Sequence, residues 1–160
     1  MKPKKRKLDL KKLEKLINKS KKVNVKGFKF AEEGRQTIRN IKSARIDKTY
    51  MIEADFEKDI DRSKLKLIKG IMKEPILQKT PLRVVHWRAD KFRKRSVKSV
   101  SYKLLGKRKL QLKVRGESGL YIKELVSGDE GRTKPNIAEI LGNKVKKIKL
   151  DVIKIWTGNG

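Results

Sequence analysis

The spacing of apolar residues in the first part of the chain predicts a helix followed by a strand. Apolar side chains recur at helical spacing from Leu10 to Ile17, directly after Asp9, whose carboxylate suits a helix cap. Apolar residues then alternate with polar ones from Val23 to Phe30. This alternation predicts a strand, with Gly27 as a bulge.

A second helix and a second strand are predicted over residues 31–44 and 48–56. In the helix, Ile38 and Ile41 fall on the side that we expect to face the core. In the strand, period-two alternation places Tyr50 on the apolar face, at the edge of a core rather than in solvent.

Two later helices begin at residues that suit an N-cap. Asp61 predicts the start of a helix over residues 62–70. Asn136 predicts the start of a short helix that ends at Gly142. A third helix is predicted between them, from Tyr121 to Val126.

The second half of the chain also contains several segments with strand patterns. Gly106 supplies the turn geometry for a hairpin between two of them. The predicted segments are a piece between Pro75 and Pro81 and the strands 82–87, 93–105, 109–115 and 145–156, with a loop over 128–135. Because strands this far apart in sequence must pair, we expect an α+β fold with a mixed, largely antiparallel sheet flanked by helices. The expected organisation is a basic arm over residues 1–7 and a single domain over 8–160.

The charge balance narrows the class of partner. The chain has 46 Lys and Arg residues against 18 Asp and Glu, a formal net charge of +28. Such a chain is expected to bind a polyanion. Nucleic acid is the first candidate partner, and an anionic membrane surface is the second. No apolar run is long enough for a spanning helix and the N-terminus lacks a signal-peptide pattern, so we expect a cytoplasmic protein.

Other features of the composition exclude whole classes of site. Cysteine is absent and His86 is the single histidine, which excludes thiol chemistry and multi-histidine metal sites. Abundant lysine and isoleucine, with only 3 methionines, are typical of a thermophile.

Basic residues concentrate in three places that suit contact with RNA phosphates. The alternative interpretation is a disordered tail for the arm and a solvated face for the central run, and the loop could either hold a phosphate or bend around RNA. Trp87, inside the central run, fits either structural packing or stacking on a base. The candidate RNA-contacting residues are Lys4, Lys5 and Arg6 of the arm, Arg83, Arg88, Arg93 and Arg95 of the central run, and Arg132 and Lys134 of the loop.

Several motifs carry a resemblance to a known family. Gly119-Leu-Tyr-Ile-Lys-Glu-Leu125 resembles the strand-to-helix motif of pseudouridine synthases. The longer stretch that runs on to Asn136, together with residues 78–86 and 150–153, resembles the archaeal and eukaryotic tRNA pseudouridine synthases that modify the T-loop. This resemblance covers essentially the whole chain and implies an isomerase whose partner is tRNA.

The resemblance implies roles for three residues and a reaction without metal or cofactor. Lys48-Thr-Tyr50 is similar to the motif whose aromatic residue stacks on the target base, and Tyr121 matches the tyrosine that lies under the uracil. Lys123 matches the basic residue that pairs with the family's catalytic aspartate. By pattern alone, Tyr50 also fits a core aromatic, Tyr121 a polar cap of the sheet and Lys123 a solvated lysine.

One family motif has no counterpart in the chain. The catalytic aspartate of the family lies in a context like Gly-Arg-Glu-Asp, and no aspartate here has those neighbours. The chain is therefore expected to be a fragment, one half of a split enzyme or a decayed relative, inactive until a separate chain supplies that motif and the N-terminal RNA-binding region. The alternative function is that of a non-catalytic RNA-binding protein, such as a ribosome-associated or tRNA-chaperone domain.

Overall fold

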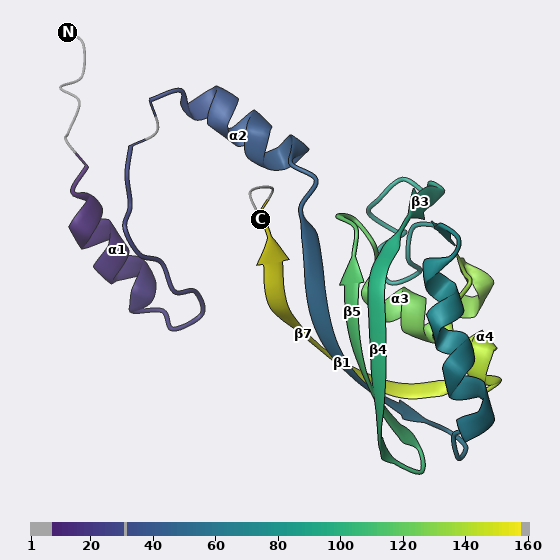
Figure 1. Cartoon of the computed structure of the whole chain (residues 1–160). Helices are drawn as coiled ribbons and strands as arrows, with labels where there is room; N and C mark the ends of the chain where they lie inside the picture. Colours follow the sequence, from purple (N-terminus) through teal and green to yellow (C-terminus); the bar gives the residue numbers. More distant parts are fainter. Residues whose placement is uncertain (1–7, 31, 158–160) are drawn as a thin grey trace, which may run out of the picture. The chain divides into compact units, whose positions relative to one another are not determined.

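The computed structural model describes residues 8–30 and 32–157 (Figure 1). Its internal contacts divide the chain into two compact units, Met1–Ala44 and Arg45–Gly160, which we call the N-terminal unit and the C-terminal unit. The expectation of a single domain over 8–160 stays a prediction. The predicted basic arm lies outside the described residues.

In the N-terminal unit, the first predicted helix is confirmed as α1, Leu10–Asn18. The Asp9 carboxylate accepts the backbone N–H groups of Lys11 and Lys12 at 3.0 and 3.1 Å, so it caps the helix as predicted. The second predicted helix is confirmed as α2, Gly34–Ser43. The inward orientation of Ile38 and Ile41 is wrong, because both side chains are more than half exposed.

The strand predicted over residues 23–30 is also wrong, because this segment has no strand partner. Its backbone is instead held by side chains of α1: the Asn18 amide bonds both the N–H and the C=O of Val25. The Gly27 N–H donates to Glu14, and Gly27 has φ +70°, a local turn rather than a bulge in a ladder. Alternating apolar residues form a strand only when a neighbouring strand pairs with their backbone groups.

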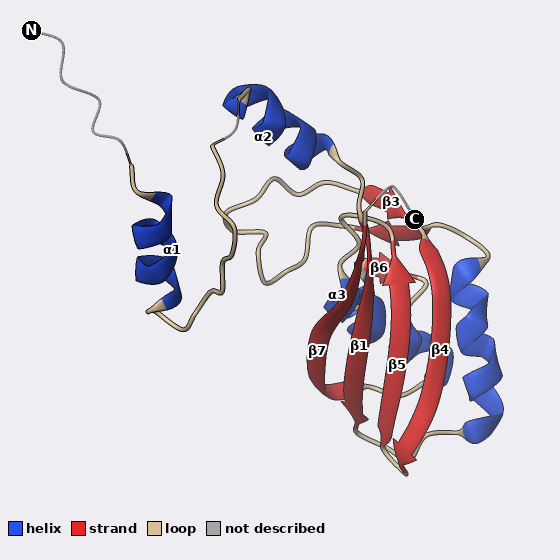
Figure 2. Ribbon diagram, turned by 60° about the vertical axis from the view of Figure 1, so that its left-hand side comes forward, coloured by secondary structure: helices blue, strands red, loops and turns tan. Residues whose placement is uncertain are grey.

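The C-terminal unit is built on a four-stranded antiparallel sheet in the order β4-β5-β1-β7 (Figure 2). Its strands are β1 (Asp47–Phe56), β4 (Val97–Gly106), β5 (Lys109–Gly116) and β7 (Val145–Trp156). Ile52 pairs with Leu112 on one side and Leu150 on the other, so apolar residues line up across one face. Residues of the other parity, such as Glu53, line up on the opposite face.

Three helical segments cover the apolar face of this sheet: the 3₁₀ helix η1 (Arg62–Met72), α3 (Ile122–Ser127) and α4 (Ile137–Leu141). The core that they enclose includes Ile52, Phe56 and Leu112, each at most 1% exposed. Asp61 and Asn136 cap η1 and α4 as predicted, although η1 has 3₁₀ geometry. The predicted α+β class with a largely antiparallel sheet flanked by helices is confirmed. None of the helices in the described part of the chain is long and apolar enough to cross a membrane.

A second, three-stranded antiparallel sheet has the order β3-β2-β6. Its strands are β2 (Ile76–Gln78), β3 (Arg93–Arg95) and β6 (Thr133–Lys134), and the 3₁₀ turn η2 (Asp129–Gly131) precedes β6. The single strand predicted over 93–105 is therefore two strands in different sheets, separated at Ser96. The Ser96 N–H leaves the ladder to bond the Glu117 carboxylate at 2.9 Å.

The strand predicted over residues 82–87 is wrong, because this segment is a series of turns. The N–H of Val84 bonds the C=O of Pro81, and the N–H groups of Trp87 and Arg88 both bond the C=O of Val84. The backbone thus satisfies itself locally, and no ladder forms.

Side chains join three strands at one end of the large sheet. The Trp156 indole donates to Thr49 Oγ1 at 2.9 Å. Arg115 lies 3.8 Å and Lys154 3.6 Å from the centre of the Trp156 ring, and Arg115 also pairs with Asp47 at 3.1 Å. These contacts link β1, β5 and β7 through an indole flanked by cations.

Candidate functional site

The start of α3 is shaped by a tight turn and a buried amide. Gly119 has φ +85°, and the Arg95 side chain lies 3.0 Å from where a Cβ at Gly119 would be, so a larger residue would be strained and crowded there. Tyr121 follows as the N-cap of α3. Its N–H donates to Gln78 Oε1 and its C=O accepts from Gln78 Nε2, both at 2.9 Å.

The Tyr121 side chain lies beside two arginines of the turn-rich segment. Arg88 Nη1 donates to the Tyr121 hydroxyl at 3.3 Å, and the Arg83 guanidinium lies 5.9 Å from the centre of the Tyr121 ring. The structure thus brings together three of the predicted site residues: Tyr121, Arg83 and Arg88.

Arg83 is fixed by Glu124, a residue that the sequence did not single out. Arg83 Nε donates to Glu124 Oε1 at 2.7 Å, and this bond raises the pKa of Arg83. The Glu124 side chain is only 5% exposed, and its second oxygen has no hydrogen-bond partner in the described part of the chain. Nothing in the sequence around Glu124, one position after Lys123, indicates that its side chain would be buried beside Arg83, which lies 41 residues earlier.

Lys123 lies in the first turn of α3, between Tyr121 and Glu124, and its side chain is exposed. It makes no ion pair or hydrogen bond with any residue that the structure describes. Its ammonium is therefore free to pair with an acid or a phosphate that the described residues do not supply.

Tyr50 lies on the core-facing side of β1, opposite Val114 and Val152. It is half-buried against the core, and this burial raises the pKa of its phenol. No hydrogen bond, ion pair or ring contact joins Tyr50 to Tyr121 or Lys123 within residues 8–30 and 32–157.

The raised pKa of Tyr50 predicts a specific loss of stability in alkali. A phenol whose folded pKa exceeds its unfolded value of about 10 stabilises the fold below that pH, and this contribution is lost as pH rises through the folded pKa. We expect Tyr50→Phe to change the free energy of unfolding near neutral pH by less than about 0.5 kcal/mol. Above about pH 10 it should lose less stability than the unaltered protein, measured by urea unfolding. Parallel stability curves across this range would contradict the prediction.

The other predicted RNA contacts differ in how much of each side chain is already engaged. Arg132 bonds Thr80 O at 2.9 and 3.2 Å and Asp90 at 2.5 Å, so its guanidinium chiefly holds the chain together. Arg93 donates to Thr80 Oγ1 at 2.9 Å. The Nε of Arg95 is buried, and no described residue accepts a hydrogen bond from it. Lys134 makes no ion pair in the described chain. Lys4, Lys5 and Arg6 lie outside the described residues.

Two aromatic side chains near this basic segment are exposed. Trp87 is 64% exposed and packs edge-on against His86, with ring centres 4.0 Å apart. Phe92 is 63% exposed, with the Lys79 ammonium 4.9 Å from its ring centre. Sequence reasoning noted Trp87 and missed Phe92, which the interleaving of aromatic and basic residues would have indicated.

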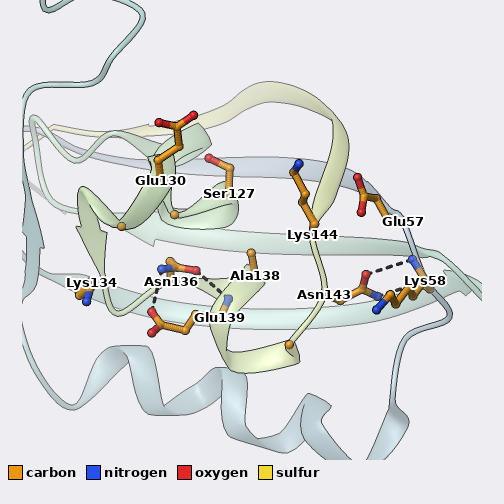
Figure 3. A pocket seen from close by; sticks show the side chains of 13 residues that line it. Glu57, Lys58, Ser127, Glu130, Lys134, Asn136, Ala138, Glu139, Asn143 and Lys144 are labelled. Carbon is orange, nitrogen blue, oxygen red and sulfur yellow. Dashed lines mark hydrogen bonds between the residues drawn. The ribbon is translucent and has the colours of Figure 1, made fainter.

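A pocket with a volume of about 510 Å³ lies elsewhere in the C-terminal unit (Figure 3). It is lined by residues at the C-terminal end of α3, such as Ser127, whereas Tyr121 and Lys123 lie at the N-terminal end. The buried amides in its wall are used by the fold: Asn143 bonds the N–H and the C=O of Lys58, and Asn136 caps α4. Among the described residues, no group of three or more acidic or histidine side chains could hold a metal ion.

Comparisons with known proteins agree with this architecture. The family model described as "Pus10, C-terminal" matches residues 1–156. The chain is 38% identical over 157 residues to "tRNA pseudouridine synthase Pus10" of Thermofilum pendens, covering 96% of this chain and 35% of that protein. For the proteins of the same name from Archaeoglobus fulgidus and Methanocaldococcus jannaschii the identities are 39% and 38%, with 96% and 98% of this chain and 42% and 34% of those proteins covered.

Among solved structures, a chain of "Crystal Structure of a Cbf5-Nop10-Gar1 Complex" superposes with a TM-score of 0.50 at 22% identity. The match covers 66% of this chain and 30% of that chain, and it shows the shared fold alone. The chain spans about two fifths or less of the length of the archaeal relatives named above. The resemblance that the motifs indicated is confirmed: this chain belongs to the Pus10 C-terminal family.

Proposed function

We propose that this chain supplies part of the active site and part of the RNA-binding surface of an enzyme that isomerises a T-loop uridine of tRNA to pseudouridine. In this reaction the C–N bond between uracil and ribose breaks and a C–C bond forms. The base exchanges a proton on carbon for one on nitrogen, so substrate and product have the same composition. The observation that carries the proposal is the arrangement at the start of α3, where Tyr121 lies beside two arginines and Lys123 has no ionic partner among the residues that the structure describes.

Each of these side chains has a chemical role in the proposal. Lys123 pairs with a catalytic aspartate that another segment supplies, because a cation beside a carboxylate keeps that carboxylate ionised as a nucleophile must be. Tyr121 offers a ring face to the uracil, with its hydroxyl oriented by Arg88. Tyr50, at the edge of the core, is the proposed aromatic partner that stacks on the target base.

The RNA-binding part of the proposal rests on charge. The basic run that contains Arg83, Arg88, Arg93 and Arg95 lies in one segment with the exposed rings of Trp87 and Phe92. In such a segment, cations can neutralise phosphates and aromatic rings can stack on unpaired bases. This combination suits the binding of a looped RNA. Lys134 and the arm residues Lys4, Lys5 and Arg6 extend this set.

Complementation tests the proposal. The chain is mixed with a segment that carries the Gly-Arg-Glu-Asp motif and the N-terminal region of a Pus10 relative, and pseudouridine is mapped in T-loop RNA. We expect pseudouridine only in the mixture, because positioning and electrostatic support without a nucleophile give little rate.

The matched control replaces the aspartate of the added segment by alanine and should abolish the product. Robust activity from this chain alone would show that its own aspartates had been misjudged. A well-folded mixture that binds tRNA without forming pseudouridine would favour a non-catalytic RNA-binding protein.

A further inference from the structure

Gln78 contacts the backbone of Tyr121 through both ends of its side-chain amide. Its Oε1 accepts the Tyr121 N–H and its Nε2 donates to the Tyr121 C=O, both at 2.9 Å. One primary amide carries both an acceptor and a donor, so it bonds one residue as a neighbouring strand would. The Tyr121 C=O also accepts the Leu125 N–H of α3 at 3.0 Å, so the amide adds a second bond to a carbonyl of the helix and supplies an acceptor to the Tyr121 N–H.

The Gln78 amide is itself held in place. Gln78 is the last residue of β2, paired with Arg93 and Thr133 on either side, and it is fully buried. Its Nε2 also donates to Thr133 Oγ1 at 3.3 Å. A buried amide fixed by strand pairing and by a third hydrogen bond has one orientation, because turning it would leave buried polar groups unpaired.

This contact connects the small sheet to the residues of the candidate site. Tyr121 is the N-cap of α3 and has no side-chain cap of its own, so the amide of Gln78 sets where the helix begins. Lys123 follows two residues later in the first turn. A displacement of the Tyr121 backbone would therefore move both side chains together.

We propose that Gln78 is a positioning residue, which holds Tyr121 and Lys123 in the geometry that catalysis needs. The claim that catalysis needs this geometry rests on the proposed function. The claim that Gln78 holds Tyr121 and Lys123 in place concerns the folded chain alone. The experiment below separates the two.

The chain contains a matched control for Gln78. Asn143, 6% exposed, bonds the N–H and the C=O of Lys58 at 3.1 and 2.7 Å, the same type of contact at a similar depth. Within the described chain, no hydrogen bond joins it to Tyr121. Gln78→Met and Asn143→Leu each remove one such amide while keeping side-chain volume, so a general loss of stability should affect both variants.

The first measurement needs no RNA and no second segment. The chain has 3 tyrosines, so ring-labelled tyrosine gives three sets of NMR signals, and Tyr121→Phe identifies those of Tyr121. We expect Gln78→Met to shift or broaden the Tyr121 signals and to leave those of Tyr50 and Tyr102 in place. Asn143→Leu should move none of the three.

Thr133→Val gives a milder second test in case Gln78→Met does not fold. It removes only the 3.3 Å bond that orients the amide, so the Tyr121 signals should shift in the same direction by less. Unchanged Tyr121 signals in the folded variants, or equal shifts in Asn143→Leu, would overturn the proposal.

The second measurement uses the complemented enzyme. A catalytic group misplaced by about 1 Å costs up to about a hundredfold in rate, so we expect kcat to fall about tenfold or more in Gln78→Met, with KM for tRNA changed by less than about threefold. Asn143→Leu should keep kcat. Equal losses of kcat in the two variants would mean that Gln78 only stabilises the fold. The part of the proposal that concerns catalysis would then be rejected. If the unaltered mixture is inactive, the proposed function fails while the NMR result still decides the positioning role.

Discussion

Lys123→Ala should lower the rate of pseudouridine formation by the complemented enzyme by about 10²-fold to 5 × 10³-fold. Removing one partner of a buried ion pair costs about 3–5 kcal/mol, because the remaining charge is left without compensation. The carboxylate of the added segment would then have a raised pKa and would be protonated over part of the neutral range. The rate of the variant should therefore increase as pH rises, over a range in which the rate of the unaltered enzyme does not change with pH.

Two further variants make this result specific to the charge at Lys123. Lys123→Arg keeps the charge and should retain part of the activity, although its planar head group fits the site of a lysine imperfectly. Lys66→Ala removes an exposed lysine of η1 and should have no effect. An unchanged rate in Lys123→Ala, or an equal loss in Lys66→Ala, would remove Lys123 from the proposed site.

The affinity of the chain for tRNA should fall steeply with salt. The formal charge is +28, and each phosphate that a lysine or arginine neutralises releases a counterion. With about 6–10 phosphate contacts, binding should weaken by about 10³–10⁵-fold between about 50 mM and about 200 mM salt. A filter-binding titration across this range measures the slope, and an affinity independent of salt would rule out the electrostatic mode.

Single substitutions should assign that slope to particular residues. Arg88→Ala should weaken binding and lower the magnitude of the salt slope by about one, because it removes about one phosphate contact. Lys66→Ala provides the comparison, since it removes the same charge from η1. Equal effects of the two substitutions would mean that binding is spread over the whole surface.

Predictions from the local sequence were confirmed where one side chain determines where a helix begins. Asp9, Asp61 and Asn136 each cap the helix that they were expected to cap, because the capping bond lies within three residues of the cap. The alternation around Ile52 predicted a half-buried strand, and β1 has partners on both sides. These elements required no knowledge of distant residues.

The errors share one physical cause: the structure of each segment depends on contacts that its periodic pattern does not contain. Val23 to Phe30 alternates like a strand, yet the backbone of Val25 is bonded by the side chain of Asn18. Residues 82–87 are rich in apolar and basic residues, yet Pro81 starts a series of turns that satisfies the backbone locally. The break at Ser96 depends on Glu117, which lies 21 residues further along. A periodic pattern does not state whether a partner strand exists.

Some features of the candidate site could be predicted from the sequence, and others depend on contacts between distant residues. The family motif located Tyr121 and Lys123 at the start of a helix, where the structure has them. It could not indicate that Arg88 would reach the Tyr121 hydroxyl from 33 residues away, or that Gln78 would bond its backbone from 43 residues away. Both contacts arise only when the turn-rich segment and the small sheet pack beside α3.

The setting of Trp156 gives the protein two separate fluorescence reporters. The chain has 2 tryptophans, and they differ in surroundings. Trp156, at the end of the edge strand β7, is partly buried, bonded to Thr49 of β1 and beside two cations, whereas Trp87 is 64% exposed in the basic segment. A collisional quencher such as acrylamide reaches an exposed indole first. Quenching that disappears when RNA is added therefore reports on the surroundings of Trp87, and a change in the emission of Trp156 reports on the separation of β7 from β1.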